Sequence, residues 1–463
     1  MILSASEWAA QQWATADLGD RRRTQRAIEI GAKMAAHPDA SLPNQMESRA
    51  ALRGAYLLLN HPDISLDALL TPHCQATLRA AGQQPWVLMV EDTTELDYTA
   101  HPHTSGLGPI GDGRGRGLLL HSTLAVLPDT RSVLGLAHAQ VVRRTPAPAS
   151  RPHWTRSAES RVWEESARAI GRPPAGSVWV HVSDRGSDIF EYMAECLAQG
   201  QAFVVRACHN RLLHWDADSL QAHQAEAHAL IDYARSLSAQ PGSAYRVTIA
   251  ATKDQPAREV HLVLTWAPIT FAPPSQAPPH VQQYGPLQVW VVRAWEAEPP
   301  AGVEPVEWIL LTSLPVTTAA DARRTTHWYE CRWLSEDYHQ CLKTGCRVEA
   351  SQLDDAADLF RLLGFAAPIA VRLLQLRQAA RHTPGVPASA VVDFLMVEVL
   401  ARRQQTDAFS MTAAEFWRRV AQLGGHQGRR RDGDPGWRTV WRGWRYLSDL
   451  TEGARLVRPP ETC

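Results

Sequence analysis

Four polar side chains near the middle of the chain recur at short helical intervals: Tyr329, Arg332, Glu336 and Lys343. At 3.6 residues per turn, offsets of three, four and seven keep all four on one face of a continuous helix. A helix face that packs into a core is apolar, so this row is not a core stripe. It sets one carboxylate among the cationic groups that bind phosphate.

Two further carboxylates, Asp92 and Asp184, lie far upstream. Each follows an apolar run, Trp86–Val90 or Val178–Val182, and is expected at a strand end. Carboxylate oxygens are the ligands that hard divalent cations prefer. Two such ions about 3.5–4 Å apart can activate an attacking hydroxyl and stabilise a leaving oxygen at a phosphodiester. The three acids therefore predict a site for two Mg²⁺ ions, for which Mn²⁺ can substitute, that cuts and joins DNA.

Each aspartate also has a structural alternative. Asp92 could end a strand and accept an Asx-type bond from Thr94. Asp184 could cap the helix that follows it, and Asp188, four residues later, competes with it for the second position.

The helical motif has alternatives of the same kind. An Arg332–Glu336 pair could be an ordinary i,i+4 salt bridge on an exposed helix. Asp337 competes with Glu336, but it is turned by about 100° from the face that carries Arg332 and Lys343.

Composition is that of a globular protein of two to four domains, with 463 residues, 45% hydrophobic and 21% charged. The formal net charge is -1. A DNA-binding function therefore requires that positive charge be concentrated in patches. Three arginine clusters could form them: Arg21, Arg22, Arg23 and Arg26; Arg143, Arg144, Arg151, Arg156 and Arg161; and Arg429, Arg430 and Arg431.

Seven cysteines form no CxxC pair and no zinc spacing. No signal peptide is evident, and no uninterrupted apolar run reaches about 18 residues, the length of a membrane span. A cytoplasmic protein with reduced thiols and no membrane partner is expected.

The order of elements predicts an α/β fold. Residues 1 to about 75 are expected to be helical, followed by strands at Trp86–Val90, Leu118–Leu127, Val133–Val142, Val178–Val182 and Ala202–Ala207, with helices among them. This order suggests a mixed sheet covered by helices. β-patterned runs separated by prolines follow, then one long helix at Ala319–Thr344 and a helix at Leu353–Ala380. The tail is helical, and its tryptophans Trp437, Trp441 and Trp444 form a stripe typical of a core or a partner interface.

With these residues placed, the chain resembles the cut-and-paste DDE transposases of the insertion-sequence-four family, Tn-five type. The spacing Y-(2)-R-(3)-E-(6)-K is that family's YREK signature. Three further segments carry the resemblance: Ala16–Arg22, Glu91–Thr94 and Asp184–Ile189. The similarity runs over nearly the whole chain.

The resemblance implies an RNase H-like mixed-sheet catalytic core with a β-strand insertion, flanked by helical domains. The implied domains are a DNA-end-binding domain (1–80), a catalytic domain (81–381, with the insertion at about 210–318) and a dimerisation domain (382–463).

The resemblance also assigns residues. The implied catalytic and metal-binding acids are Asp92, Asp184 and Glu336, and the implied DNA contacts are Tyr329, Arg332, Lys343, Trp308, Arg206 and Arg26. Tyr329, Arg332 and Lys343 would hold the 5′ phosphate side of a hairpin. Trp308 would occupy the space around a flipped base.

The implied enzyme is a bacterial, nucleoid-associated transposase that works as a homodimer on terminal inverted repeats and joins 3′-OH ends to target DNA. The alternative is a non-catalytic DNA-binding inhibitor of transposition. Four positions depart from the family pattern and bear on end binding: Leu57, Ala36, His37 and Gln340.

Overall fold

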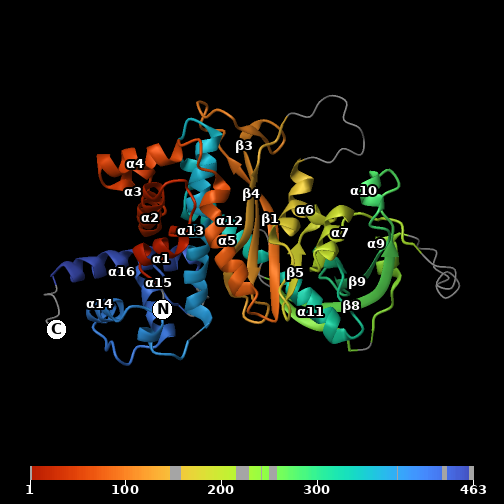
Figure 1. The fold of residues 1–463 in the computed structure, drawn as a ribbon. Coiled ribbons are helices and arrows are strands. Elements are labelled where there is room, and N and C mark those ends of the chain that lie inside the picture. Colours follow the sequence, from red (N-terminus) through yellow and green to blue (C-terminus); the bar gives the residue numbers. More distant parts are fainter. Residues whose placement is uncertain are drawn as a thin grey trace. The chain divides into compact units, whose positions relative to one another are not determined.

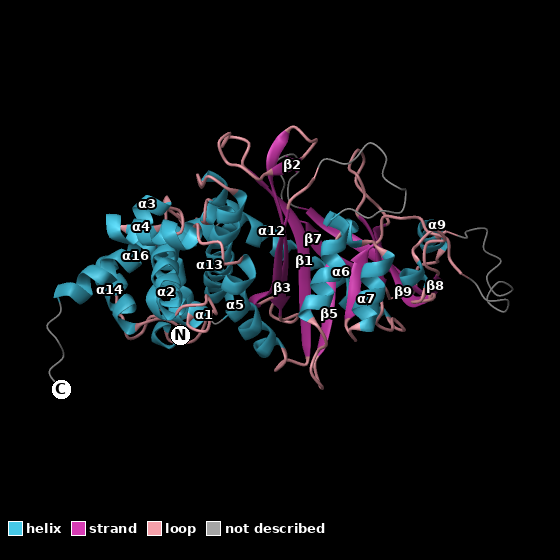
Figure 2. Ribbon diagram, turned by 45° about the horizontal axis from the view of Figure 1, so that its top comes forward, coloured by secondary structure: helices cyan, strands magenta, loops and turns pink. Residues whose placement is uncertain are grey.

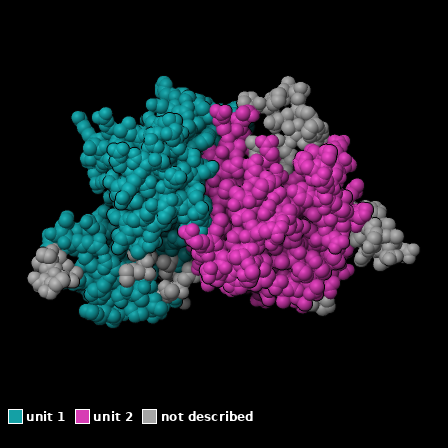
Figure 3. Space-filling model, in the orientation of Figure 1, with its two compact units in different colours: residues 1–77, 95–118, 336–463 teal, residues 78–94, 119–335 magenta. Residues whose placement is uncertain are grey.

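The computed structural model describes residues 3–145, 158–214, 229–240, 242–249, 258–382, 384–429 and 435–457. The chain forms two compact units (Figure 3). Unit 1 comprises Met1–Thr77, Glu95–Leu118 and Glu336–Cys463, and unit 2 comprises Leu78–Thr94 and Leu119–Ser335. Of the predicted arginine clusters, Arg151, Arg156, Arg430 and Arg431 lie outside the described residues.

Unit 1 is mainly helical. Its N-terminal helices are α1 (Ala5–Trp13), α2 (Arg21–Ala36), α3 (Leu42–Met46), α4 (Arg49–Leu59) and most of α5 (Leu66–Ala81). Its C-terminal helices are α13 (Ala356–His382), α14 (Phe394–Gln404), α15 (Ala413–Leu423) and α16 (Trp437–Val457), with short turns η3 (Val348–Ala350) and η4 (Ala388–Ala390). The predicted helical character of both ends is confirmed.

Local chemistry explains where the first helices begin. Ser4 and Glu7 form a reciprocal capping box at the start of α1. Asp20 caps α2 by accepting a hydrogen bond of 2.8 Å from the Arg22 N–H. Gly31 lets the two helices approach, since a Cβ there would lie 2.1 Å from the Trp13 ring.

Helix α13 is long and apolar enough, by length and composition, to cross a membrane over Ala356–Leu376. However, 89% of that window is buried inside the protein, which is the pattern of a core helix. Pro368 lies within the helix without ending it.

The C-terminal helices α15 and α16 meet at two glycines. A Cβ on Gly424 would lie 1.9 Å from the Thr439 carbonyl oxygen, and one on Gly443 would lie 1.7 Å from the Val420 carbonyl oxygen. The helices therefore cross at backbone contact. The predicted tryptophan stripe of α16 belongs to the core, because Trp437, Trp441 and Trp444 are all buried.

A buried histidine makes the stability of unit 1 sensitive to pH. His73 on α5 is buried, with Nδ1 2.6 Å from Gln12 Oε1. Burial lowers the pKa of His73 from 6.5 to about 4. The unfolded chain takes up this proton first, so folding stability should fall as the pH drops from 6.5 to 4. The difference of 6.5 − 4, about 2.5 units, corresponds to a loss on the order of 3 kcal/mol.

Urea unfolding at pH 7 and pH 4 would measure this loss, with His73→Gln as the comparison. The glutamine keeps a polar contact to Gln12 but does not titrate. The prediction is wrong if the wild type and His73→Gln lose equal stability over this interval.

Unit 2 contains most of one mixed sheet (Figure 1). Its strands are β1 (Trp86–Asp97), β2 (Gly108–Ile110), β3 (Gly115–Val126), β4 (Val133–Val142), β5 (Val178–Ser183), β6 (Ala202–Arg206), β7 (Tyr245–Ile249), β8 (Arg258–Phe271), β9 (Leu287–Glu296) and β10 (Glu307–Thr312). The strand order is β2-β3-β1-β5-β6-β10-β9-β8-β7, with β4 paired to β3. β2, the end of β1 and the start of β3 fall in unit 1. The mixed α/β architecture is consistent with an RNase H-like core, as the sequence predicts.

Strands β1, β5 and β6 run parallel, which requires helical crossovers between them. Helices α6 (Ala158–Ile170) and α7 (Phe190–Ala198) supply these and lie over one face of the sheet (Figure 2). Trp163 of α6, Met193 of α7 and Phe203 of β6 belong to one buried cluster there. The core thus holds the parallel strands in fixed register.

The predicted β-rich segment extends the same sheet. β10 pairs antiparallel with β6, and β9, β8 and β7 follow outwards as antiparallel neighbours. Short helices α9 (Leu230–Ser236) and α10 (Pro279–Gln282) accompany these strands.

The prediction of a single helix over Ala319–Thr344 is wrong. Helix α11 (Ala319–Glu330) ends, and α12 (Trp333–Gln340) begins after two turn residues. The backbone tightens at this junction, since the Arg332 N–H bonds the Tyr329 carbonyl and the Ser335 N–H bonds the Arg332 carbonyl, both at 3.0 Å. The Ser335 hydroxyl also donates to the Arg332 carbonyl at 2.6 Å, and such side-chain bonds compete with the regular helix ladder.

After Gln340 the backbone widens instead. Residues Cys341–Gly345 form the π-helical turn η2, closed by a 2.8 Å bond from the Cys346 N–H to the Cys341 carbonyl. The four motif residues therefore occupy α11, a turn, α12 and a π turn rather than one continuous helix face.

The strand that carries the first aspartate is also longer than predicted. β1 continues through Asp92 to Asp97, so Asp92 lies inside the strand rather than at its end. The polar residues after Val90 conceal this extension, because strand propensity is low for Asp and Glu.

Candidate active site

The register of two neighbouring parallel strands brings Asp92 and Asp184 to equivalent positions. β1 and β5 pair from Trp86 opposite Val178 to Val90 opposite Val182. Asp92 and Asp184 each follow two residues beyond that last pair. Asp92 lies within β1, and Asp184 is the first residue after β5, which ends at Ser183. Adjacent strands lie about 4.8 Å apart, so this register sets the two backbone positions next to each other at one end of the paired segment.

Asp92 is held by the α11–α12 junction. Its Oδ1 accepts a 2.8 Å hydrogen bond from the Thr93 N–H. Its Oδ2 lies 3.4 Å from the Arg332 guanidinium and 3.4 Å from the Ser335 hydroxyl. Both Asp92 and Arg332 are about seven-eighths buried in their side chains. The Arg332 cation of the helical motif therefore contacts the first of the two upstream aspartates.

Asp184 caps the 3-10 turn η1 (Arg185–Ser187), with its Oδ1 accepting a 2.8 Å bond from the Gly186 N–H. The capping contact expected under its structural alternative is thus present. It uses one oxygen of a half-buried carboxylate.

Asp188 is the competitor for the second position, and it is occupied by structural contacts. Its Oδ2 accepts hydrogen bonds from the Cys208 and His209 N–H groups at 2.7 and 2.8 Å, and its Oδ1 pairs with Arg211. Asp188, Cys208 and His209 could by spacing hold a metal ion, but the bound guanidinium disfavours a second cation there.

A buried cluster of one glutamate and two histidines includes Glu91, the residue directly before Asp92, and sequence reasoning missed it. Glu91, His121 and His181 are fully buried on the neighbouring strands β1, β3 and β5. Glu91 Oε1 pairs with His181 Nδ1, and Oε2 lies 3.3 Å from His121 Nε2. His121 Nδ1 contacts the Thr93 hydroxyl at 2.9 Å. Burial alone would raise the pKa of Glu91, but His181 and His121 lower it to about 2.

Two predicted DNA-contacting aromatic residues also meet. The rings of Trp308 on β10 and Tyr329 on α11 lie 5.5 Å apart, edge to face. Arg206, at the end of β6, donates a 3.0 Å hydrogen bond to the Glu307 carbonyl next to Trp308. Trp308, Tyr329 and Arg206 thus form a connected group within unit 2.

The remaining predicted residues belong to unit 1. Glu336, exposed on α12, directly follows Ser335 in the chain. Lys343 lies on the π turn η2, with its Nζ 3.6 Å from Glu349. Gln340, one of the departures from the family pattern, accepts a 2.6 Å hydrogen bond from the Trp437 indole N–H. This contact gives the glutamine a structural role of its own.

Positive charge in the N-terminal helices gathers on α2 and α4. Arg26 is paired with Glu29 at 3.2 Å. Arg49 and Arg53 are exposed on α4, and Leu57 continues their helical spacing with 64% of its surface exposed. Ala36 and His37 are partly buried at the end of α2.

Residues 5–64, which span α1 to α4, match the family model described as transposase DNA-binding. The match covers the segment with the exposed arginines of α2 and α4. It supports a transposase and DNA as a partner of this chain.

Proposed function

We propose that this chain is a cut-and-paste DDE transposase of the insertion-sequence-four family with the YREK signature. One observation supports the catalytic part above all: Asp92 and Asp184 follow the last paired residues of adjacent parallel strands in matching register. The transposase DNA-binding match at the N-terminus supplies the substrate class.

The residues fit a divalent-cation site. Asp92 and Asp184 offer carboxylate oxygens, the donor type that Mg²⁺ and Mn²⁺ prefer, and Glu336 is the proposed third ligand. Cations bound there would stabilise the charge on the attacking and leaving oxygens of a phosphodiester. Arg332, which faces Asp92 at 3.4 Å, would bind the phosphate as the carboxylate turns to the cations.

The proposed reaction has four transfers. Water attacks a phosphodiester at the element end, forming one P–O bond as the 3′ oxygen leaves with a proton. The freed 3′-OH attacks a phosphodiester of the opposite strand, and the new P–O bond closes a hairpin as the 3′ oxygen of the flanking DNA leaves with the proton. Water then attacks the hairpin phosphodiester, which leaves a 5′ phosphate and frees the same 3′-OH. This 3′-OH finally attacks a phosphodiester of target DNA, whose 3′ oxygen leaves with the proton. Tyr329, Arg332 and Lys343 are proposed to hold the hairpin phosphate, with Trp308 at the flipped base. Arg26 is proposed to contact the element end, and Arg206 is a further proposed DNA contact.

The test is cleavage by the purified full chain of linear DNA that carries the terminal inverted repeats flanking its own gene. Cleavage with Mg²⁺ or Mn²⁺, and none with EDTA, is expected, with hairpin ends visible on denaturing gels. A homodimer is expected in the DNA complex, measured by light scattering. Specific binding of these ends without cleavage under any metal would instead identify a non-catalytic inhibitor of transposition.

A further inference from the structure

A cavity of about 790 Å³ opens in unit 2 along α11. Its wall comes from five segments that are distant in sequence: the start of β1, the β3–β4 turn, the residues before β7, Leu264 of β8, and α11 from Ala319 to Trp328. Cavities of roughly 300–1,000 Å³ are typical of small-ligand sites. None of its lining residues belongs to the proposed catalytic group.

The cavity has an aromatic wall. Trp86 and Trp328 both line it, with ring centroids 5.3 Å apart. Leu264 and Pro85 add apolar surface beside them. Planar aromatic rings of this kind stack with nucleobases, which all present a π face.

One wall residue carries an unused hydrogen-bonding group. Ser243 is 3% exposed, and its hydroxyl has no hydrogen-bond partner among the described residues. Buried hydroxyls are normally paired, because leaving one unpaired costs free energy. A ligand in the cavity would supply a partner for this hydroxyl.

The rim is cationic. Arg323, Arg324 and His327 are exposed on α11, and all three line the cavity. Arg323 lies over the Tyr245 ring at 4.8 Å, and Arg324 lies over the Trp328 ring at 5.5 Å. Guanidinium groups placed beside aromatic rings are suited to binding a phosphate next to a stacked base.

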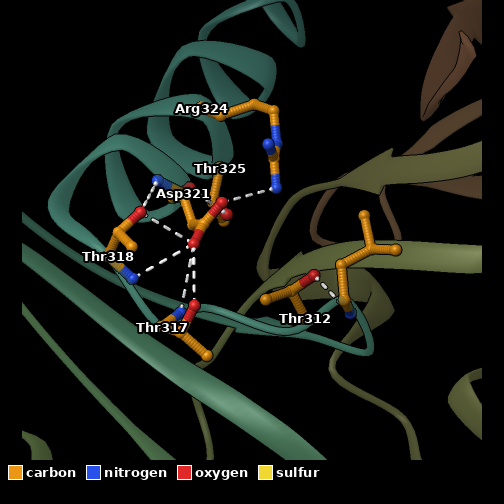
Figure 4. A network of polar contacts seen from close by, with 7 residues as sticks. Thr312, Thr317, Thr318, Asp321, Arg324 and Thr325 are labelled. Atoms are coloured by element: carbon orange, nitrogen blue, oxygen red, sulfur yellow. Dashed lines mark hydrogen bonds and ion pairs between the residues drawn. The ribbon is translucent and has the colours of Figure 1, made fainter.

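Two acidic side chains near the rim, Asp321 and Glu330, already make ion pairs with other residues. Asp321 accepts hydrogen bonds from the Thr318 N–H and hydroxyl at 3.0 and 2.8 Å, and so caps α11 (Figure 4). It also pairs with Arg324 at 3.0 Å, while Glu330 pairs with Arg131 at 2.6 Å. Asp129 lies in the cavity wall itself. Within the described part of the chain Arg323 makes no ion pair of this kind, so it is the cation best placed to meet a phosphate.

Helix α11 connects this cavity to the proposed hairpin contacts. Arg324 precedes Tyr329 by five residues, a rise of about 7.5 Å at 1.5 Å per residue. A DNA strand held at Trp308 and Tyr329 would reach the cavity within two or three nucleotides.

We propose that this cavity binds one unpaired nucleotide of a DNA strand, with the base against Trp86 and Trp328 and the phosphate at Arg323. The proposal rests on the proposed function for its ligand class. It adds a second nucleotide-binding site along α11, lined by Trp328 next to Tyr329 and by Arg323 and Arg324 one to two turns before it.

The test uses a fluorescein-labelled thymidine oligonucleotide of about 15 nucleotides and the full chain in EDTA, with affinity measured by anisotropy. Ser243→Ala should weaken binding about threefold without lowering stability in urea, since the removed hydroxyl has no partner to lose. Ala320→Trp, which fills the cavity, should weaken binding about tenfold. Arg323→Ala should weaken it five- to tenfold and reduce the slope of log affinity against log salt by about 1.

Arg246→Ala is the matched control, because Arg246 is exposed on β7 and does not line the cavity. It should bind within twofold of wild type. The cavity proposal is overturned if Ser243→Ala and Ala320→Trp also bind within twofold. Cleavage of element ends by the wild type is scored separately, so failure of the cavity leaves that result standing, and the reverse also holds.

Discussion

Asp92→Asn should reduce Mg²⁺-dependent cleavage of element ends by at least about 10³-fold while the protein remains folded. Asparagine replaces a charged carboxylate with one neutral oxygen, and metal-ion stabilisation of a phosphoryl transfer contributes several kcal/mol, at about 1.4 kcal/mol per factor of ten. The amide keeps an oxygen for the Thr93 N–H, so the strand is not disrupted. Single-turnover cleavage on gels measures the rate.

The control for this variant is Asp112→Asn, which removes an exposed carboxylate that forms an ion pair with Arg114. It should cleave at the wild-type rate. Cleavage by Asp92→Asn within tenfold of wild type would exclude Asp92 as a metal ligand. End binding by both variants should be unchanged in EDTA.

Glu91→Ala should lower the free energy of unfolding by about 3–5 kcal/mol at pH 7. It removes the only carboxylate that contacts the two fully buried imidazoles His121 and His181 in the described structure, and leaving buried ionic partners unmatched is costly. Urea unfolding followed by circular dichroism would measure the loss. A change below about 1 kcal/mol would show that the cluster does not hold the sheet together.

Lowering the pH should remove the stabilisation that Glu91 provides. The pKa of Glu91 falls from 4.5 in the unfolded chain to about 2 in the folded protein, so its stabilisation is complete above pH 4.5 and is lost as the pH falls towards 2. Glu91→Gln keeps the shape and an acceptor but not the charge. It should lose less stability than Glu91→Ala at pH 7 and should lack this acid-dependent loss.

Much of the sheet could be predicted from sequence because its strands are apolar runs closed by turns. Val133–Val142 is β4 as predicted, and Val178–Val182 differs from β5 by one residue. The order of strands in space could not be predicted in the same way, since β10 joins the sheet at β6 through pairing between distant segments.

The motif shows where periodicity misleads. Spacing alone suggests one helix for Tyr329 and Arg332. In the structure the Ser335 hydroxyl donates a hydrogen bond to the Arg332 carbonyl, and the helix is interrupted between Tyr329 and Arg332. Periodicity records which residues could share a face, but it does not record local competition for backbone groups.

Glu91 shows a second limit of prediction from sequence, which is that contacts between distant strands are not visible in it. In sequence it is one polar residue after an apolar run, and nothing nearby indicates that His121 and His181 meet it. Glu91, His121 and His181 come together because strands β3, β1 and β5 are neighbours in the sheet, and this order is known only from the fold. Gln340 is similar, because its bond to Trp437 joins positions 97 residues apart.

The crossing of α15 and α16 limits how this part of the chain can evolve. At Gly424 and Gly443, a methyl group would collide with a main-chain oxygen of the opposite helix rather than with a side chain. A second substitution could not relieve that collision by making a neighbouring side chain smaller, since the clashing atom is a backbone carbonyl oxygen, which every residue has. Relatives that keep this crossing should therefore keep glycine at both positions, while those that lose either one must separate the helices.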